Sequence, residues 1–359
     1  MARIFIFLLV IHNTISAQVS EAFVWYDPMD HMERFEGQGW DNMGYHRFPD
    51  KAKNLVRDAV WQLSQNAAGL NIKFQTDSQQ IVVKYIVSER LGMPHMPTTG
   101  VSGLDLYTKD GDKWLWCKGA YQFKDTIEYH FKIKRQPDTV REYQLFLPLY
   151  NTVKHLEIGV PKTKGFKFIP CSTKKPIVVY GTSIVQGACA SRPGMAWTNI
   201  VSRNINSPIV NLGFSGNGRL EEEVIDLLME IDAAVYVLDC MPNLKPSDTK
   251  EEVMKRIFRS VDQLRVNNNT VPIVLVQHSG YSDGLVNWER QHRYKTLNKW
   301  LTKSYKQLIK DGAKNVYLIT KSDLCMTNDS YVDGTHPNDL GMNQYAKAYQ
   351  KTFMKILPY

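Results

Sequence analysis

Hydrophobic and polar positions follow different periods in the two halves of the chain. From about residue 19 to 160, short segments such as Glu142–Leu147 alternate apolar and polar residues, which is typical of half-buried strands. Only Lys51–Gln65 has a helical pattern in this half. Several short strands separated by turns predict a β-sandwich of the jelly-roll kind. The predicted strands are Leu70–Thr76, Gln80–Val87, Leu104–Thr108, Lys113–Lys118, Thr126–Ile133, Glu142–Leu147 and His155–Val160.

From about residue 172, continuous apolar strands alternate with amphipathic helices. The predicted strands are Pro176–Tyr180, Ile209–Leu212, Ala233–Leu238, Pro272–Val276 and Val316–Thr320. Strands without polar positions are buried on both faces, which indicates a parallel sheet between two layers of helices. The predicted fold is therefore a three-layer, flavodoxin-like α/β domain with a five-stranded parallel sheet, preceded by the β-sandwich.

The start of the chain has the pattern of a cleavable secretory signal. Arg3 precedes an apolar run that ends at Ile11, and the small pair Ser16-Ala17 follows. The run is too short to cross a membrane, which needs about 20 residues. We therefore expect an exported protein, secreted or periplasmic, without a membrane span. The expected division is a signal peptide (1–17), a β-domain (18–160), a linker (161–175) and an α/β domain (176–359).

Composition and charge narrow the possible partners. The chain is 43% hydrophobic and 22% charged, which is ordinary for a globular protein. The net charge of +8 comes without a dense basic block, so we expect no nucleic-acid partner. Metal-ligand spacing and cofactor motifs are absent, so we expect neither a metal nor a cofactor. The five cysteines leave one or two disulfides open: Cys117, Cys171, Cys189, Cys240 and Cys325.

Four segments at the ends of predicted parallel strands carry the candidate chemistry, because ligands bind beyond the carboxyl ends of such strands. GTSI places Ser183 just after the first strand. GFSGNG, residues 213–218, has three glycines that allow close approach of the backbone to a ligand. DCMPN ends on Asn243. In DGTHP, Asp333 and His336 are three residues apart and can form the orienter and base of a catalytic triad.

Each segment also has a plain structural explanation when taken alone. Ser183 could cap a helix, GFSGNG could be a tight turn, and Asn243 could cap one. A dinucleotide fingerprint in GFSGNG is disfavoured because the third glycine of GxGxxG is missing. Together, however, the segments supply a nucleophile, a base, an orienter and hydrogen-bond donors in the order Ser, Asp, His. That combination is what acyl transfer needs.

The four segments resemble the conserved blocks of the SGNH, or GDSL-type, hydrolases. GTSI looks like the nucleophile block, GFSGNG the glycine block, DCMPN the asparagine block and DGTHP the DxxH block. GLDLY, residues 103–107, is similar to the GxDLY signature of the β-domain that precedes one branch of this superfamily. Two departures from the pattern are Thr182 at the position of the family's Asp, and Pro242 in the asparagine block.

This resemblance implies a serine esterase. Ser183 would attack an ester carbonyl, His336 would carry the proton and Asp333 would orient the imidazole. The implied oxyanion hole consists of the Ser183 amide, the Gly216 amide and the Asn243 side chain. Exported enzymes of this branch look like carbohydrate esterases, so the implied substrate is an O-acetylated polysaccharide or oligosaccharide.

Other assignments stay open from sequence alone. His278 and Trp288 are candidate substrate contacts, although a satisfied histidine and a packed tryptophan are the alternatives. The β-domain could bind carbohydrate, wall the cleft or form a dimer, and we favour a domain that lends loops to the site. A lipase or thioesterase and a non-catalytic carbohydrate-binding protein are the alternative functions. No sequence feature indicates the oligomeric state. We treat the other histidines as structural: His31, His46, His95, His130, His155 and His292.

Overall fold

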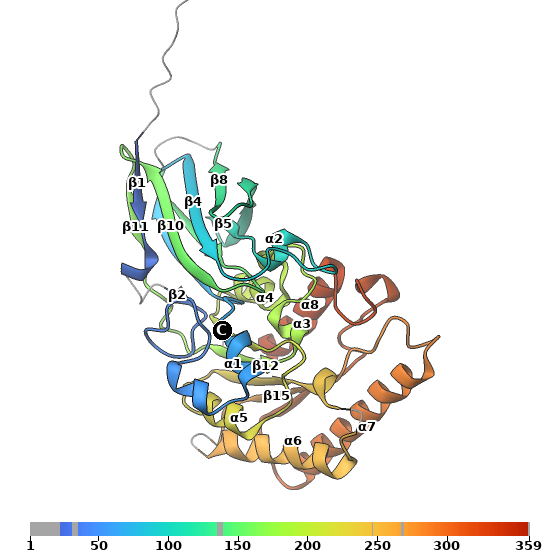
Figure 1. Ribbon diagram of the computed structural model, residues 1–359. Coiled ribbons are helices and arrows are strands. Elements are labelled where there is room, and N and C mark those ends of the chain that lie inside the picture. Colours follow the sequence, from blue (N-terminus) through green and yellow to red (C-terminus); the bar gives the residue numbers. More distant parts are fainter. Residues whose placement is uncertain (1–21, 31–34, 135–138, 246, 267–268, 358–359) are drawn as a thin grey trace, which may run out of the picture.

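The computed structural model has an antiparallel, β-rich part followed by a three-layer α/β part, which confirms the predicted fold class (Figure 1). No helix of the described chain is long and apolar enough to cross a membrane. The predicted signal, residues 1–17, lies outside the described residues. The structure describes residues 22–30, 35–134, 139–245, 247–266 and 269–357.

The β-rich part is a sandwich of two antiparallel sheets around one apolar core. In spatial order, the first sheet contains β1 (Phe23–Tyr26), β10 (Val153–Pro161), β4 (Gln80–Val87), β8 (Ile127–Lys132) and β7 (Gly119–Gln122). The second contains β11 (Phe166–Phe168), β3 (Asn71–Thr76), β9 (Arg141–Phe146), β5 (Asp105–Asp110) and β6 (Lys113–Cys117), with β2 (Phe35–Glu36) paired to β3. Buried side chains of both sheets, such as Val83 and Leu145, share this core.

A five-stranded parallel sheet forms the middle layer of the α/β part. In spatial order its strands are β13 (Ile209–Gly213), β12 (Ile177–Gly181), β14 (Val235–Asp239), β15 (Ile273–Val276) and β16 (Val316–Ile319). Along the chain this is the flavodoxin-like order 2-1-3-4-5, whose switch point lies between β12 and β14. Every residue of these two strands is buried, which explains their continuous apolar sequence.

Helices cover both faces of this parallel sheet (Figure 1). One face carries α3 (Ser183–Gln186), α4 (Trp197–Ile205) and α8 (Asp339–Ile356). The other carries α5 (Glu222–Leu228), α6 (Lys250–Arg265) and α7 (Trp288–Lys310). The remaining short helices are η2 (Asp50–Asn54), α1 (Asp58–Ser64), α2 (Thr98–Val101), η3 (Pro193–Met195), η4 (Met241–Asn243) and η5 (Asn328–Ser330).

Two predicted elements differ from the structure. The expected helix 51–65 is split into η2 and α1, because Arg57 is extended and its guanidinium donates to Asn217 Oδ1 at 2.7 Å. The expected linker 161–175 contains β11, which pairs with β3. Phe166 and Phe168 of this short strand pack against the core of the sandwich, so the connection between the two parts is shorter than the sequence indicated.

The GLDLY segment joins the two parts of the molecule. Leu106 lies in the sandwich core, whereas its neighbours Asp105 and Tyr107 point to the α/β part. Arg192 Nη1 donates to Asp105 Oδ2 and to Tyr107 Oη, both at 2.7 Å. The Gly194 amide also donates to Asp105 Oδ2 at 2.7 Å. The alternation of this segment therefore places Leu104 and Leu106 in the sandwich core. Asp105 and Tyr107 form polar contacts between the two parts.

Arg47 makes a second junction, in a segment of the N-terminal half that packs on the α/β part. Its side chain is buried, and burial lowers the pKa of the guanidinium to about 9. Nε donates to Asn66 O at 2.8 Å, while Nη1 donates to Asn211 O at 3.1 Å and Gly213 O at 2.7 Å. Asn66 follows the C-terminus of α1, and Asn211 and Gly213 belong to β13. One side chain therefore satisfies backbone acceptors of both segments.

We predict that Arg47→Lys lowers the free energy of unfolding by about 2–4 kcal/mol, because lysine lacks the planar fork and leaves buried carbonyls without donors. Urea unfolding followed by circular dichroism measures the change. Arg57→Lys is the matched control, since the Arg57 side chain is 40% exposed and its ion pair with Glu221, which lysine can keep, should change stability by about 1 kcal/mol or less. Equal losses in the two variants would contradict the assigned role of Arg47.

Candidate active site

Ser183 is the first residue of α3, two residues after β12 ends at the carboxyl edge of the parallel sheet. The Thr182 side chain caps α3 by accepting a hydrogen bond from the Ile184 amide at 3.4 Å. Thr182, which departs from the family's Asp, therefore supports this turn as an N-cap residue. The Ser183 residue is 6% exposed, and its Oγ lies 2.9 Å from His336 Nε2.

His336 is held between Ser183 and Asp333. Its Nδ1 lies 2.7 Å from Asp333 Oδ2, and its backbone amide donates to Asp333 Oδ1 at 2.8 Å. Burial alone would raise the pKa of the Asp333 carboxyl, but the hydrogen bonds and charge of His336 outweigh burial and lower the pKa to about 2. An ionised Asp333 accepts a hydrogen bond from Nδ1–H, so Nε2 presents its lone pair to the Ser183 hydroxyl.

The loop that carries Asp333 and His336 is fixed at both ends. The Val332 amide donates to the His336 carbonyl at 2.9 Å, which closes the loop on itself. Arg290, in the first turn of α7, donates to Gly334 O at 3.1 Å and to Thr335 Oγ1 at 2.9 Å. The start of α7 therefore lies directly beside the loop that carries Asp333 and His336.

The glycine and asparagine segments meet next to Ser183. The Phe214 amide donates to Gly181 O at 3.0 Å, which places GFSGNG against the serine turn. Asn243 Oδ1 accepts a hydrogen bond from the Gly218 amide at 3.2 Å, which leaves its NH2 group as the donor. Gly216 has φ of +71°, and a Cβ there would face open space. A positive φ favours glycine, and the open side is available to a ligand.

Asp239, the first residue of DCMPN, is fully buried at the end of β14. Its Oδ2 accepts a hydrogen bond from Tyr349 Oη at 2.8 Å. Burial raises the pKa of the Asp239 carboxyl to about 7, more than the hydrogen bond from Tyr349 lowers it. The segment that leads to Asn243 therefore begins at a buried carboxyl group whose ionised form is destabilised by the loss of solvation.

The two candidate substrate contacts have opposite environments. The ring of His278 is fully buried, which favours the alternative of a packed histidine over a contact with substrate. Its Nδ1 accepts from the Gly280 amide at 2.9 Å, and burial lowers its pKa to about 3, which keeps the ring neutral. Trp288, at the start of α7, is 75% exposed and follows the exposed residues Leu285 and Val286. Its contact with substrate stays a prediction.

His95 and Cys189 also reach this site, although the sequence predicts only a structural role for His95. His95 lies between β4 and α2, and its ring centroid is 5.8 Å from that of His336. The Cys189 thiol donates to His95 O at 3.3 Å. Burial, together with the charge of Asp333, raises the pKa of this thiol to about 12. A lone histidine in another part of the chain carries no sequence signal for this position.

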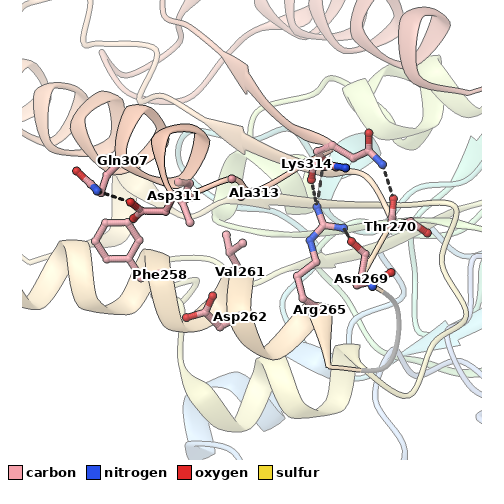
Figure 2. Close-up of a pocket in the computed structure, with 13 residues that line it drawn as sticks. Phe258, Val261, Asp262, Arg265, Asn269, Thr270, Gln307, Asp311, Ala313 and Lys314 are labelled. Atoms are coloured by element: carbon pink, nitrogen blue, oxygen red, sulfur yellow. Dashed lines mark hydrogen bonds between the residues drawn. The ribbon is translucent and has the colours of Figure 1, made fainter.

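A hollow of about 750 Å³ lies away from this site (Figure 2). Its lining includes Thr270 and Lys314, which precede β15 and β16 and so mark the amino edge of the sheet. Arg265 crosses it and donates to Asn269 O at 2.9 Å and to Lys314 O at 2.7 Å. These contacts tie two loops together, whereas Ser183 lies at the opposite, carboxyl edge of the sheet.

Comparison with known families agrees with this fold. Residues 174–354 match the GDSL-like lipase/acylhydrolase family, and residues 23–166 match the N-terminus of SGNH-hydrolase-type esterases. The chain belongs to the GDSL-like lipase/acylhydrolase family, and fold and family define it as an SGNH-type ester hydrolase. No match was found among the curated proteins.

Solved structures extend the comparison over nearly the whole chain. A GDSL-like lipase from Bacteroides ovatus is 33% identical, with a TM-score of 0.86 over 93% of this chain and 98% of that one. The salicylyl-acyltransferase SsfX3 of a tetracycline biosynthetic pathway is 20% identical, with a TM-score of 0.73 over 94% and 98%. A family two carbohydrate esterase from Clostridium thermocellum, solved with cellohexaose, is 11% identical, with a TM-score of 0.54 over 80% and 92%.

We predict that Asn243→Asp lowers kcat for ester hydrolysis by about 10²–10³, with little change in KM. Aspartate keeps an oxygen for the Gly218 amide but replaces the donor NH2 group with an oxygen. Steady-state kinetics on 4-nitrophenyl acetate measures the effect. Asn204→Asp is the control, because Asn204 is an exposed residue of α4 whose side chain contacts Gln350, and its kcat should change by only a few fold. An unchanged kcat in Asn243→Asp would remove this residue from the oxyanion hole.

We predict that Asp239 makes the protein less stable as pH rises from about 4 to 7. The folded-state pKa, about 7, lies above the ordinary value of 3.8, so the unfolded chain loses its proton first. Linkage gives about 1.4 kcal/mol per pH unit, or up to about 4 kcal/mol in all. Urea unfolding at several pH values, compared with Asp239→Asn, isolates this slope. The same slope in the variant would assign it to other groups.

Proposed function

We propose that this protein is a serine esterase that removes O-acetyl groups from carbohydrates. The single observation that carries the proposal is the hydrogen-bonded chain from Ser183 Oγ through His336 to Asp333, with distances of 2.9 Å and 2.7 Å. This arrangement activates a serine hydroxyl for acyl transfer, because the carboxylate orients the imidazole and the imidazole accepts the hydroxyl proton.

In the acylation half of the proposed reaction, Ser183 Oγ bonds to the acetyl carbon while its proton moves to His336 Nε2. The carbonyl oxygen becomes an oxyanion, which accepts hydrogen bonds from the Ser183 amide, the Gly216 amide and the Asn243 NH2 group. The bond to the sugar oxygen then breaks, and His336 returns the proton to that oxygen. The products of this half are the free sugar hydroxyl and acetyl-Ser183.

Water completes the cycle in the deacylation half. His336 Nε2 accepts a proton from water, whose oxygen attacks the acetyl carbon, and the same donors hold the second oxyanion. Collapse releases acetate and restores the Ser183 hydroxyl with the proton from His336. Throughout both halves, the ionised Asp333 stabilises the imidazolium that forms on His336, which the low pKa of Asp333 supports.

A carbohydrate substrate is supported by the exposed tryptophan beside the catalytic loop. Trp288 is two residues from Arg290, which donates to the Gly334 carbonyl, and an exposed indole offers a flat apolar face to a sugar ring. The fold is also that of a carbohydrate esterase solved with cellohexaose. Export, proposed from the sequence of residues 1–17, would bring the enzyme to polysaccharides outside the cytoplasm.

A lipase- or thioesterase-type acyl hydrolase is the second candidate. Leu285 and Val286 are 83% and 89% exposed on the same segment as Trp288, and these side chains suit a longer acyl chain better than a sugar. The segment from Leu285 to Trp288 could therefore contact either a sugar ring or a long acyl chain, and the two candidate functions predict different occupants for it.

We predict that the mature chain releases acetate from 4-nitrophenyl acetate and from acetylated polysaccharides, and that Ser183→Ala lowers this release by at least about 10³-fold. A series of 4-nitrophenyl esters from acetyl to octanoyl separates the two candidates, because kcat/KM should fall with chain length for an acetylesterase. Rising kcat/KM along the series would favour the lipase.

Trp288→Ala refines the same experiment. We expect it to raise KM for acetylated polysaccharide, with KM for 4-nitrophenyl acetate unchanged, because the small ester has no sugar to stack on the indole. Turnover that persists in Ser183→Ala would overturn the proposed function as a whole.

A further inference from the structure

Four side chains with metal-binding atoms meet at the catalytic histidine. His95, Cys189, Asp333 and His336 each bring one nitrogen, sulfur or oxygen atom into a group whose members all lie within 4.8 Å of one another. Only Asp333 and His336 are needed for the proposed chemistry. His95 and Cys189 complete the set without a part in proton transfer, so the cluster contains more donors than the reaction uses.

The two additional donors come from separate elements. His95 is exposed and belongs to the loop between β4 and α2 of the β-rich part. Cys189 is buried, follows α3 and has φ of +67°. The hydrogen bond from Cys189 Sγ to His95 O joins these segments at 3.3 Å, and the Ser191 carbonyl accepts from Thr99 Oγ1 at 2.7 Å. The donors therefore sit on backbone that is fixed at two points.

This donor set suits zinc. Zinc prefers four ligands in a tetrahedron, at about 2.0–2.2 Å for nitrogen and oxygen and about 2.3 Å for sulfur. Neighbouring ligands in such a tetrahedron are roughly 3.3–3.7 Å apart. The group on the protein, whose ligand atoms lie within 4.8 Å of one another, is thus wider than a closed site, and zinc binding would draw the four side chains together. The thiolate and the carboxylate together offset the two positive charges of the ion.

We propose that a zinc ion binds His95, Cys189, Asp333 and His336 and reversibly switches the enzyme off. This inference rests on the proposed function for its effect on activity. If His336 Nδ1 coordinates zinc, the ring proton that Nδ1 donates to Asp333 must move to Nε2, which then has no lone pair for Ser183. If Nε2 coordinates zinc, the metal replaces the hydrogen bond to Ser183. In either case the imidazole cannot accept the serine proton. Binding releases the Cys189 thiol proton to solvent.

The first test is inhibition of 4-nitrophenyl acetate hydrolysis by buffered free Zn²⁺. Wild-type protein should lose at least 90% of its activity on binding roughly one equivalent, and chelation by EDTA should restore it. His95→Ala and Cys189→Ser, each compared with its own metal-free rate, should need at least about 10-fold more free Zn²⁺ for half inhibition. His130→Ala and Cys325→Ser remove an exposed histidine and an exposed thiol elsewhere and should not shift it.

The second test reads binding without activity. Ser183→Ala protein titrated with Co²⁺ should develop visible absorption of a tetrahedral ion and a thiolate-to-cobalt charge-transfer band, both with one equivalent per chain. The band should disappear in the Ser183→Ala, Cys189→Ser double variant, while the circular dichroism of the folded protein persists. His95→Ala in the same background, a change at an exposed side chain, should weaken Co²⁺ binding at least about 10-fold.

The outcomes separate the zinc site from the proposed function. Co²⁺ binding through Cys189 in a protein that hydrolyses no ester would keep the metal site and remove the esterase. Hydrolysis that is equally sensitive to Zn²⁺ in wild type, His95→Ala and Cys189→Ser would overturn the site. A missing charge-transfer band in Ser183→Ala would also overturn it.

Discussion

Buried hydrogen bonds at the end of β13 hold the rest of the active site in place. Arg47 satisfies the carbonyls of Asn211 and Gly213 there. Asn211 Nδ2 donates to Val185 O of α3 at 2.7 Å, and Gln186 Oε1 accepts from the Ser215 amide at 3.0 Å. The nucleophile helix and the glycine segment are thus cross-linked by side chains that water does not reach, where each lost partner costs more than an exposed one.

The same constraint makes the β-rich part a component of the site. Gln186 Nε2 donates to Leu149 O at 3.3 Å, and Tyr150 Oη donates to Ser183 O at 3.3 Å. Leu149 and Tyr150 lie between β9 and β10, so the β-rich part directly contacts the helix that begins at Ser183. Asp105 holds Arg192, just beyond Cys189, through a short ion pair. The chain between α3 and η3 is therefore fixed by the β-rich part on one side. On the other side, Asp339 at the start of α8 accepts hydrogen bonds from the Ser191 amide at 2.9 Å and from the Ser191 hydroxyl at 2.6 Å. His95 reaches His336 across this junction.

Hydrophobic periodicity and the positions of strand ends predict those features of the fold and the candidate site that depend on local sequence. The parallel strands are recognisable because both of their faces are buried, and Ser183, Asn243 and His336 are found because each follows a strand end or shares a loop with its partner. His95, Cys189 and Arg47 have no such signal, since their contacts join segments of the chain that are remote in sequence. His278 shows the limit of the rule: it follows β15, but its side chain turns into the protein, and burial makes it a neutral packing residue.

The properties that suit this cluster to proton transfer also suit it to a metal ion. An imidazole that can accept the Ser183 proton must be neutral and must present a lone pair, and those are the requirements for coordination as well. Asp333 is ionised because several hydrogen bonds stabilise its charge, and an ionised carboxylate is also a better ligand. A catalytic triad by itself offers a metal ion one imidazole and one carboxylate, and zinc prefers two further donors. Here His95 and Cys189 supply those donors, so the competition between the serine proton and a zinc ion for His336 follows from the geometry of the junction between the two parts.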